Sequence, residues 1–241
     1  MQLIVQPDAG VDPIVKAIRR ARRKIDICIF RFDQSEIEKA LAEAVQKRHV
    51  VVRALIAHTN RGGEAKLRKL EQRLLDAGLS VTRTHDELLR YHGKFLVVDD
   101  VLHVFGFNFT ALDINESRSF GVATRHKRTV AEAVKLFEAD VARNPYEPAA
   151  SHLVVSPETS RQMLTEFLKG AKKDLAIYDA KISDPAMIRL LKGLAAEGVR
   201  VRVLGKLKGP DGDVQERSFK TGRLHVRAII RDGTRAFVGS Q

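Results

Sequence analysis

The chain of 241 residues repeats one pattern of hydrophobic spacing twice. In the first half, residues 25–32 alternate in hydrophobicity, a stretch with helical spacing follows, and residues 50–56 return to a β-type run. In the second half, residues 175–182 and residues 199–204 flank a similar helical stretch, and each copy begins with a cluster of basic residues. The period of the apolar residues changes from about 2 residues, as in a strand, to about 3.6 residues, as in a helix, and back again. This change is typical of a β-α-β unit, so the repeat predicts two lobes of similar fold.

The two copies meet in a short segment that breaks both patterns. Residues 144–148 read Asn-Pro-Tyr-Glu-Pro, and prolines this close together interrupt a helix or a strand. We therefore predict an α/β protein of two similar α-β-α lobes, related by a pseudo-twofold axis. The first lobe is predicted at residues 1–146 and the second at residues 147–241. Helices beyond the repeated units are predicted at residues 12–23, 64–77, 127–143 and 160–173.

The charge balance points to an anionic partner. The chain carries 42 Lys and Arg residues against 30 Asp and Glu residues, which gives a net charge of +12 at pH 7. Such an excess favours nucleic acid, phosphate esters or an anionic lipid surface as a partner. An ordinary solvated surface explains the same excess, so charge alone does not decide between these possibilities.

The sequence also limits the class and compartment of the protein. No hydrophobic run approaches the roughly 18 residues that cross a bilayer, and the first residues do not resemble a signal peptide. A single cysteine, Cys28, excludes an internal disulfide framework and a multi-cysteine zinc site. We expect a cytoplasmic protein that makes peripheral contact with an anionic membrane. Its oligomeric state is left open.

Each lobe carries a histidine and a cation, two residues apart, beside an apolar run. The first copy reads H-x-K-x4-D and the second reads H-x-R-x4-D. In a β-strand, residues i and i+2 face the same side, so each histidine points the same way as its cation. Burying an imidazole and a cation on a strand costs free energy unless they face a polar cleft. The motif residues are His92, Lys94 and Asp99 in the first lobe and His225, Arg227 and Asp232 in the second.

Two lobes related by a twofold axis would bring both histidines and both cations to one point. That set suits phosphoryl transfer, with one histidine as nucleophile, the other as general acid, and the cations near the charged phosphate. Asp99 and Asp232 follow buried strands, where we expect them to hold neighbouring segments by hydrogen bonds. Lys94 and Arg227 already supply the positive charge that a phosphate needs, and the other histidines lack the spacing of metal ligands. We therefore expect no metal and no cofactor.

The paired motifs resemble those of the phospholipase D superfamily, which includes cardiolipin synthase-like proteins, and the resemblance covers nearly the whole chain. In that family a Gly-Ser-x-Asn turn follows the motif. Here Gly106-Phe107-Asn108 and Gly239-Ser240-Gln241 stand in its place. The first turn lacks the serine and is one residue shorter, and the second stops before the asparagine. Arg227 replaces the family's lysine, which keeps the charge but changes its reach and geometry.

The resemblance implies hydrolysis or transphosphatidylation of a phospholipid phosphodiester through a phosphohistidine. It implies that His92 is the nucleophile and that His225 protonates the leaving alcohol, although the likeness of the lobes leaves the reverse assignment open. Lys94 and Arg227 would then stabilise the equatorial oxygens of the phosphate. Two other functions stay open: a nuclease of the same superfamily, and a catalytically weakened module that binds phosphate or nucleic acid.

Two further site residues follow from the same resemblance. Asn108 either contacts the substrate or forms the turn. Glu116, in Asn115-Glu116, matches the acidic residue that orients a catalytic histidine in the family, or else it is an ordinary surface charge.

The first lobe continues beyond its turn, with a predicted strand at residues 118–124 and the helix at residues 127–143. The second lobe has no counterpart of either, so we expect it to be truncated by about 35 residues. It should then show an uncovered sheet edge and an exposed apolar patch near Phe237 and Val238. It should also lack a counterpart of Glu116, which would leave one histidine poorly oriented.

Overall fold

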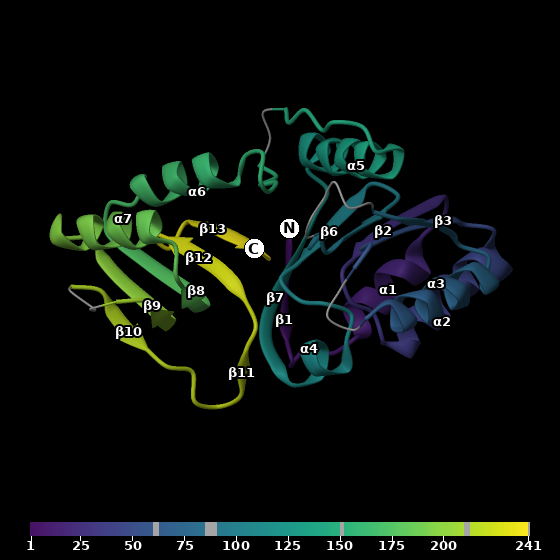
Figure 1. Cartoon of the computed structure of the whole chain (residues 1–241), viewed down its shortest axis with the longest axis horizontal. Coiled ribbons are helices and arrows are strands. Elements are labelled where there is room, and N and C mark those ends of the chain that lie inside the picture. Colours follow the sequence, from purple (N-terminus) through teal and green to yellow (C-terminus); the bar gives the residue numbers. More distant parts are fainter. Residues whose placement is uncertain (60–62, 85–90, 150–151, 210–212, 241) are drawn as a thin grey trace.

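The computed structural model describes residues 1–59, 63–84, 91–149, 152–209 and 213–240. The chain forms two α/β lobes, each built on its own sheet, and this confirms the predicted fold class (Figure 1). Among the described residues, no helix has both the length and the apolar character that crossing a bilayer requires.

The first lobe is built on a mixed sheet in which the middle strands are buried. Its strand order is β1-β7-β6-β5-β2-β3-β4. The strands β2, β3 and β4 run parallel, while β5, β6, β7 and β1 join by antiparallel pairing. Central strands with both faces covered read as continuous apolar runs, as β5 does here. The strand β2 is equally buried, and it includes Asp26, which pairs with Arg53. The strands are β1 (Gln2–Gln6), β2 (Lys24–Ile29), β3 (Val51–Ile56), β4 (Ser80–Arg83), β5 (Phe95–Val98), β6 (Val101–Phe105) and β7 (Ser117–Thr124).

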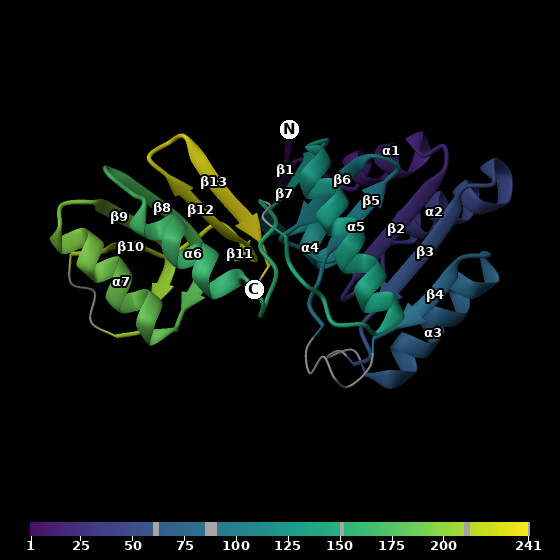
Figure 2. The same ribbon diagram turned by 90° about the horizontal axis from the view of Figure 1, so that it is seen from above.

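Helices cover both faces of the first sheet (Figure 2). Three helices pack on one face through apolar residues at helical spacing, such as Ile14 with Ile18 and Ile37 with Leu41. A longer helix covers the opposite face, where Phe137 is fully buried. The helices of the first face are α1 (Asp12–Arg20), α2 (Ser35–Arg48) and α3 (Glu64–Asp76); the opposite face carries α5 (Lys127–Ala142), and α4 (Ala111–Asn115) is a short helix before β7.

The second lobe repeats the central part of the first. Its sheet has the order β10-β9-β8-β12-β13, which corresponds to β4-β3-β2-β5-β6. Two helices pack on one face, where they bury Leu175 and Val201 against Leu191. The elements are α6 (Ser160–Lys169), β8 (Asp174–Ile182), α7 (Pro185–Ala196), β9 (Arg200–Leu207), β10 (Gln215–Arg217), β12 (Arg227–Arg231) and β13 (Arg235–Gly239).

Two aspartates at equivalent positions fix the passage from helix to strand in each lobe. The Asp99 carboxylate accepts hydrogen bonds from the backbone N–H groups of residues 22–24, and Asp232 accepts them from residues 172–174. Both aspartates have a φ of 52°. These bonds hold residues 22–24 and 172–174 at the start of β2 and β8. The helices α1 and α6 therefore each end a few residues before the predicted positions.

The lobes are joined by backbone pairing and by side chains. The strand β11 (Arg223–Leu224) precedes the second motif, yet it pairs with β7 in the first sheet. The rings of Phe120 and Tyr178 meet edge to face, with centroids 5.3 Å apart. The edge strand β13 packs against β6 and β7. Phe237 and Val238 are therefore half-buried, not exposed as the sequence led us to expect.

Candidate active site

The two motifs lie where the lobes meet. The histidine and cation of each motif stand at the beginning of β5 or β12. The contacts between the lobes are crosswise. Ser240 Oγ of the second lobe lies 2.9 Å from His92 Nδ1 of the first. Asp113 Oδ1 of the first lobe lies 2.9 Å from His225 Nδ1 of the second. Each histidine is thus held by a residue of the other lobe.

Lys94 is fixed within this junction. Its side chain is buried, with 3% of the residue exposed. The Nζ atom donates one hydrogen bond to the carbonyl oxygen of His92 and another to Ser240 Oγ, each at 2.9 Å. The ring of Phe30 lies against both groups, 5.4 Å from Lys94 Nζ and 4.7 Å from the His92 ring, centroid to centroid. A buried ammonium held by defined hydrogen-bond acceptors is a preorganised positive charge beside a histidine.

The Asp113 carboxylate is the centre of the other half of the site. It is buried, and its Oδ2 accepts hydrogen bonds from the backbone N–H of Asn108 at 2.9 Å and from Asn108 Nδ2 at 2.7 Å. Arg223 donates to Oδ1. Burial alone would raise the pKa of Asp113, but the contacts from His225, Asn108 and Arg223 together hold it well below its usual range. The carboxylate beside His225 therefore stays ionised.

A short helix brings Asp113 into this position. Thr110 Oγ1 accepts a hydrogen bond from the Asp113 backbone N–H and so caps the start of α4. Asp113 stands at the third position of that helix, on its buried side. The next strand, β7, pairs with β11, and the His225 N–H donates to the carbonyl oxygen of Arg118. These two local structures bring the carboxylate and the imidazole together.

Side chains of α5 and β2 hold the segment that carries His92. Tyr91 Oη donates to Asp140 Oδ2 at 2.6 Å, and Cys28 Sγ lies 3.2 Å from Tyr91 Oη. A Cβ at Gly93 would lie 2.7 Å from Cys28 Sγ, so glycine allows this close approach. Burial raises the pKa of Cys28 to about 12, so the thiol stays neutral and acts as a packing group.

Arg227 differs from Lys94 in its surroundings. Its Nε lies 3.3 Å from Asp179 Oδ2, and 40% of its side chain is exposed. Asp179 is opposite Arg227 in the β8–β12 pair. The second cation is therefore held by a carboxylate at the edge of the junction, where the guanidinium keeps donors for an anion.

Comparison with known proteins identifies the family. The family model described as cardiolipin synthase, PLD-like domain matches residues 14–141, more than half of the chain. The chain belongs to this PLD-like family. No curated protein matches the chain.

Solved structures show how far the PLD-like fold extends. Polyphosphate kinase from Porphyromonas gingivalis aligns with a TM-score of 0.78 at 18% identity, over 98% of this chain and 44% of that chain. Phosphatidylserine synthase from Haemophilus influenzae Rd KW20 aligns with a TM-score of 0.72 at 12% identity, over 96% of this chain and 75% of that chain. Nuc from Salmonella typhimurium, a phospholipase D family member, aligns with a TM-score of 0.53 at 19% identity, over 61% of this chain and 97% of that chain. The chain spans less than half of the polyphosphate kinase chain, and these likenesses show the fold alone.

Within this PLD-like site, Asp113 occupies the place that the sequence assigned to Glu116. Glu116 ends α4 with its side chain exposed, and it is Asp113 that contacts His225. The sequence carries a signal for this. Thr110-Ala111-Leu112-Asp113 has the spacing of a helix cap followed by an acidic third residue, which points back toward the helix start.

The other predicted residues fall into two groups. Asn108 belongs to the site, and its amide holds Asp113, while Gln241 of the second turn lies outside the described residues. Asp99 and Asp232 lie at the opposite ends of β5 and β12, where they bind backbone N–H groups. Their contacts are those of residues that hold the fold.

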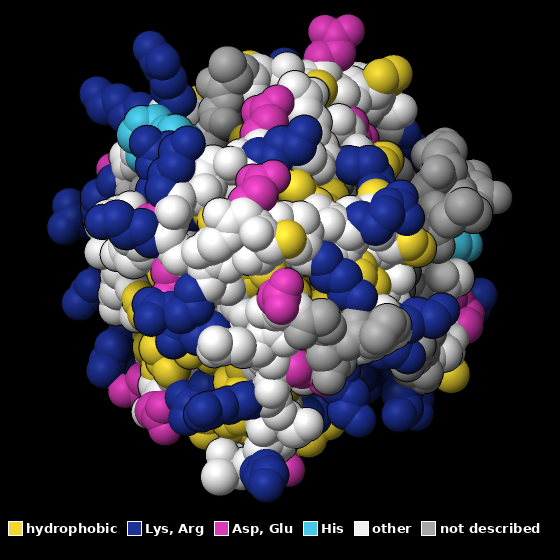
Figure 3. Space-filling view, turned by 90° about the vertical axis from the view of Figure 1, so that its left-hand side faces the viewer, with side chains coloured by type: hydrophobic (Ala, Val, Ile, Leu, Met, Phe, Trp, Pro, Cys, Tyr) yellow, Lys and Arg dark blue, Asp and Glu magenta, His cyan; other side chains and the backbone are white. Residues whose placement is uncertain are grey.

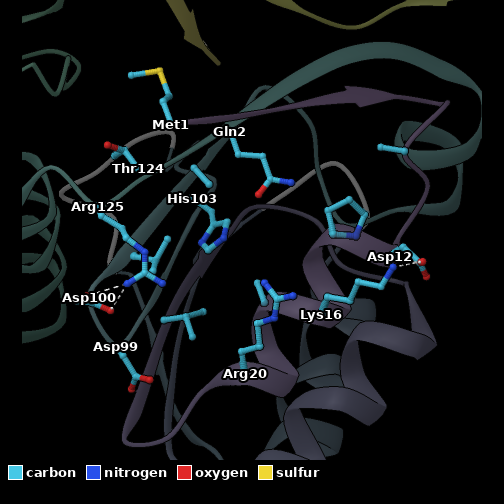
Figure 4. Close-up of a pocket in the computed structure, with 16 residues that line it drawn as sticks. Met1, Gln2, Asp12, Lys16, Arg20, Asp99, Asp100, His103, Thr124 and Arg125 are labelled. Carbon is cyan, nitrogen blue, oxygen red and sulfur yellow. Dashed lines mark hydrogen bonds and ion pairs between the residues drawn. The ribbon is translucent and has the colours of Figure 1, made fainter.

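A hollow of about 660 Å³ lies beside Asp99 and is lined by none of the motif histidines or cations (Figure 4). Two ion pairs line it, Lys16 with Asp12 and Arg125 with Asp100. This hollow is therefore separate from the PLD-like site.

Proposed function

We propose that the protein is a phosphodiesterase or phosphatidyltransferase of the phospholipase D type, which acts on a phospholipid phosphodiester through a phosphohistidine. The observation that carries this proposal is the crosswise contact at the junction, where Ser240 meets His92 and Asp113 meets His225. The contacts hold both histidines against the same boundary between the lobes. A two-step displacement requires that geometry, because one histidine attacks while the other handles the proton.

The surroundings of the two rings favour different roles. The ionised Asp113 carboxylate lies 2.9 Å from His225 Nδ1, the kind of contact that orients a histidine for proton transfer. His92 instead contacts the Ser240 hydroxyl, which also accepts a hydrogen bond from the Lys94 ammonium. A neutral ring is what a nucleophile requires. We therefore keep His92 as the nucleophile and His225 as the acid.

The proposed reaction has two balanced steps. First, His92 Nε2 forms a bond to phosphorus, the bond from phosphorus to the leaving oxygen breaks, and His225 gives its proton to that oxygen. Second, water or an acceptor alcohol attacks phosphorus, its proton passes to His225, and the bond from phosphorus to His92 breaks. Lys94 and Arg227 stabilise the negative charge on the phosphate oxygens in both steps.

A phospholipid is the favoured substrate because the matching family model describes a cardiolipin synthase-type domain. The charge of +12 suits an anionic membrane surface and also suits DNA. A nuclease is therefore the second candidate, supported by the fold shared with Nuc. The third is a module that binds phosphate without turnover, for which the Arg227–Asp179 ion pair is the supporting observation.

One side-by-side assay separates these candidates. Purified protein is incubated with phosphatidylcholine vesicles, phosphatidylglycerol vesicles and plasmid DNA, and His92→Ala is run beside each. We expect release or exchange of the lipid head group, and label from a labelled phospholipid retained on a histidine after quenching with an alkaline denaturant, with both lost in His92→Ala. Product from DNA alone would establish the nuclease. Binding without turnover on any of the three would establish the binding module.

A further inference from the structure

The two motif histidines are held in different ways. Tyr91, His92 and Gly93 precede β5 and belong to no strand. In the second lobe, Leu224 comes just before the motif histidine and belongs to β11, which pairs with β7. The His225 N–H also donates to a carbonyl oxygen of β7. Backbone pairing thus fixes the approach to the second histidine, whereas side chains must fix the approach to the first.

A side-chain hydrogen bond holds the residue before His92. Tyr91 Oη donates to Asp140 Oδ2 at 2.6 Å, and the same hydroxyl accepts from Cys28 Sγ at 3.2 Å. Burial raises the pKa of Tyr91 well above its ordinary value, so the hydroxyl keeps the proton that it donates. Burial also raises the pKa of Asp140 to about 6, so the carboxylate is ionised at neutral pH and above. A hydroxyl that donates to an ionised carboxylate makes one of the stronger hydrogen bonds in proteins.

Asp140 projects from a part of α5 that is itself fixed to the first sheet. One turn earlier, the ring of Phe137 meets the ring of Phe95 in β5 edge to face, with centroids 6.3 Å apart. Arg53 of β3 binds Glu138, with 2.6 Å between Nη2 and Oε1. Residues three apart lie on the same side of a helix, so Phe137 and Asp140 both face the start of β5. The carboxylate is therefore a fixed point for the tyrosine hydroxyl.

Close packing connects the tyrosine to the histidine. A Cβ at Gly93 would lie 2.7 Å from Cys28 Sγ and 3.5 Å from Tyr91 Cε1, so the backbone at this glycine lies against both side chains. On the other side, the carbonyl oxygen of His92 accepts a hydrogen bond from Lys94 Nζ. The short segment is therefore held before the histidine by Tyr91 and after it by Lys94.

We propose that Tyr91 and Asp140 are positioning residues for His92, and that they hold its ring in line with the phosphorus atom that it attacks. This inference rests on the proposed function, in which His92 is the nucleophile. The two residues act through the backbone of the segment, not on the phosphate. Their loss matters because a displacement of about 1 Å at a reacting group can cost about 10²-fold in rate.

A positioning role should appear in kcat and not in KM. Lys and Arg side chains are spread over the surface of the second lobe (Figure 3). Attraction between such cations and an anionic substrate acts on the encounter of the two molecules. Tyr91→Phe removes one hydroxyl and changes no charge at neutral pH, so it leaves this attraction intact. We therefore expect kcat to fall by about tenfold or more, the usual range for a supporting contact, with KM unchanged.

Variants of Asp140 test whether the two residues act as a pair. Asp140→Ala removes the acceptor and should lower kcat as much as Tyr91→Phe does. The double variant should lose no more than either single variant, because both changes remove the same interaction. Asp140→Asn keeps an acceptor oxygen and should retain more of the activity. Denaturant unfolding shows which variants are folded under assay conditions, and Tyr91→Phe carries the test where Asp140→Ala unfolds the chain.

The chain offers a matched control on the same helix. Tyr146 Oη donates to Glu132 of α5, but Tyr146 belongs to the segment between the lobes and is far in sequence from both motifs. Tyr146→Phe therefore removes the same kind of hydrogen bond from α5 and should leave kcat unchanged. Equal losses in Tyr91→Phe and Tyr146→Phe would show a general effect of loosening α5 and would overturn the proposal.

A readout without substrate separates this inference from the proposed function. In NMR spectra of the chain with isotope-labelled histidine, the His92 ring resonance is assigned by its absence in His92→Ala. It should shift in Tyr91→Phe and stay in place in Tyr146→Phe. If the chain turns over none of the three tested substrates, the proposed function fails, while the resonance still reports whether the pair positions the ring. An unmoved His92 resonance, additive losses in the double variant, or unchanged kcat in Tyr91→Phe of an active chain would overturn the proposal.

Discussion

Asp113 Oδ1 lies 2.9 Å from His225 Nδ1, although the two residues belong to different lobes and are 112 positions apart in the chain. The contact depends on β11, which carries the chain of the second lobe onto the first sheet just before His225. The fold of one lobe thus positions the motif histidine of the other, and neither lobe can supply the proposed site by itself.

Asp113→Asn should lower turnover by about 10-fold to 100-fold with little change in KM, as losses of residues that orient a reacting histidine do. The amide can still fill the space, but it lacks the negative charge that Asp113 places beside His225. Steady-state assays on the substrate found in the vesicle comparison measure the effect. Glu116→Gln discriminates between the two acidic residues, because the Glu116 side chain is exposed and its loss should be silent. A large loss in Glu116→Gln with none in Asp113→Asn would contradict this reading.

Arg227→Ala should lower turnover by about 100-fold or more, if the guanidinium stabilises charge on the phosphate as other oxyanion donors do. Arg227→Lys should retain activity, because it keeps the charge near the same point. The matched variant Asp179→Asn removes the carboxylate that pairs with Arg227 and should change KM more than kcat. Equal turnover in the natural chain, Arg227→Ala and Arg227→Lys would place Arg227 away from the reacting phosphate.

Chelation should leave activity unchanged. In the proposed site Lys94 and Arg227 supply the positive charge that a divalent cation would otherwise bring to the phosphate. The measurement is turnover after treatment with EDTA, followed by addition of magnesium. Loss of activity that magnesium restores would contradict the proposed mechanism.

Much of the fold could be predicted from the repeat. The change of apolar spacing identified both β-α-β units, and the two motifs identified the strands β5 and β12. The apolar patch at Phe237 and Val238 was not predicted correctly, because the sequence does not show that β13 packs against the first sheet. Local patterns describe each lobe but do not describe how the lobes pack together.

The histidine partners depend on that packing too. The family resemblance points to Glu116 as the acidic residue after the turn, whereas the cap at Thr110 turns Asp113 inward and leaves Glu116 at the exposed end of the helix. The two-residue strand β11 has no periodicity that a sequence could reveal. The contacts of His225 could therefore be found only in three dimensions.

Asp99→Asn should destabilise the protein in a pH-dependent way. Burial alone would raise the pKa of Asp99, but three backbone N–H groups hold it below its ordinary value of 3.8. A carboxyl group whose pKa is lowered in the folded state stabilises that state above its unfolded pKa and loses this contribution as pH falls through the folded pKa. Denaturant unfolding at several pH values should show the full difference near neutrality and a shrinking one below about pH 4. A difference that persists unchanged into acid would mean that the ionised carboxylate is not the cause.

Ser240→Ala tests the other crosswise contact. The hydroxyl joins Lys94 Nζ to His92 Nδ1, so its removal takes away this contact to the ring of the proposed nucleophile and a hydrogen-bond acceptor of the buried ammonium. We expect turnover to fall by about tenfold or more, the usual range for such a supporting contact. Ser240→Thr keeps a hydroxyl and should recover most of the activity, and Ser218→Ala, at an exposed serine, should have no effect. Labelling quenched with an alkaline denaturant gives a second readout, because slower attack by His92 lowers the rate at which label appears on the protein. Unchanged turnover and labelling in Ser240→Ala would show that the first histidine is oriented without this hydroxyl.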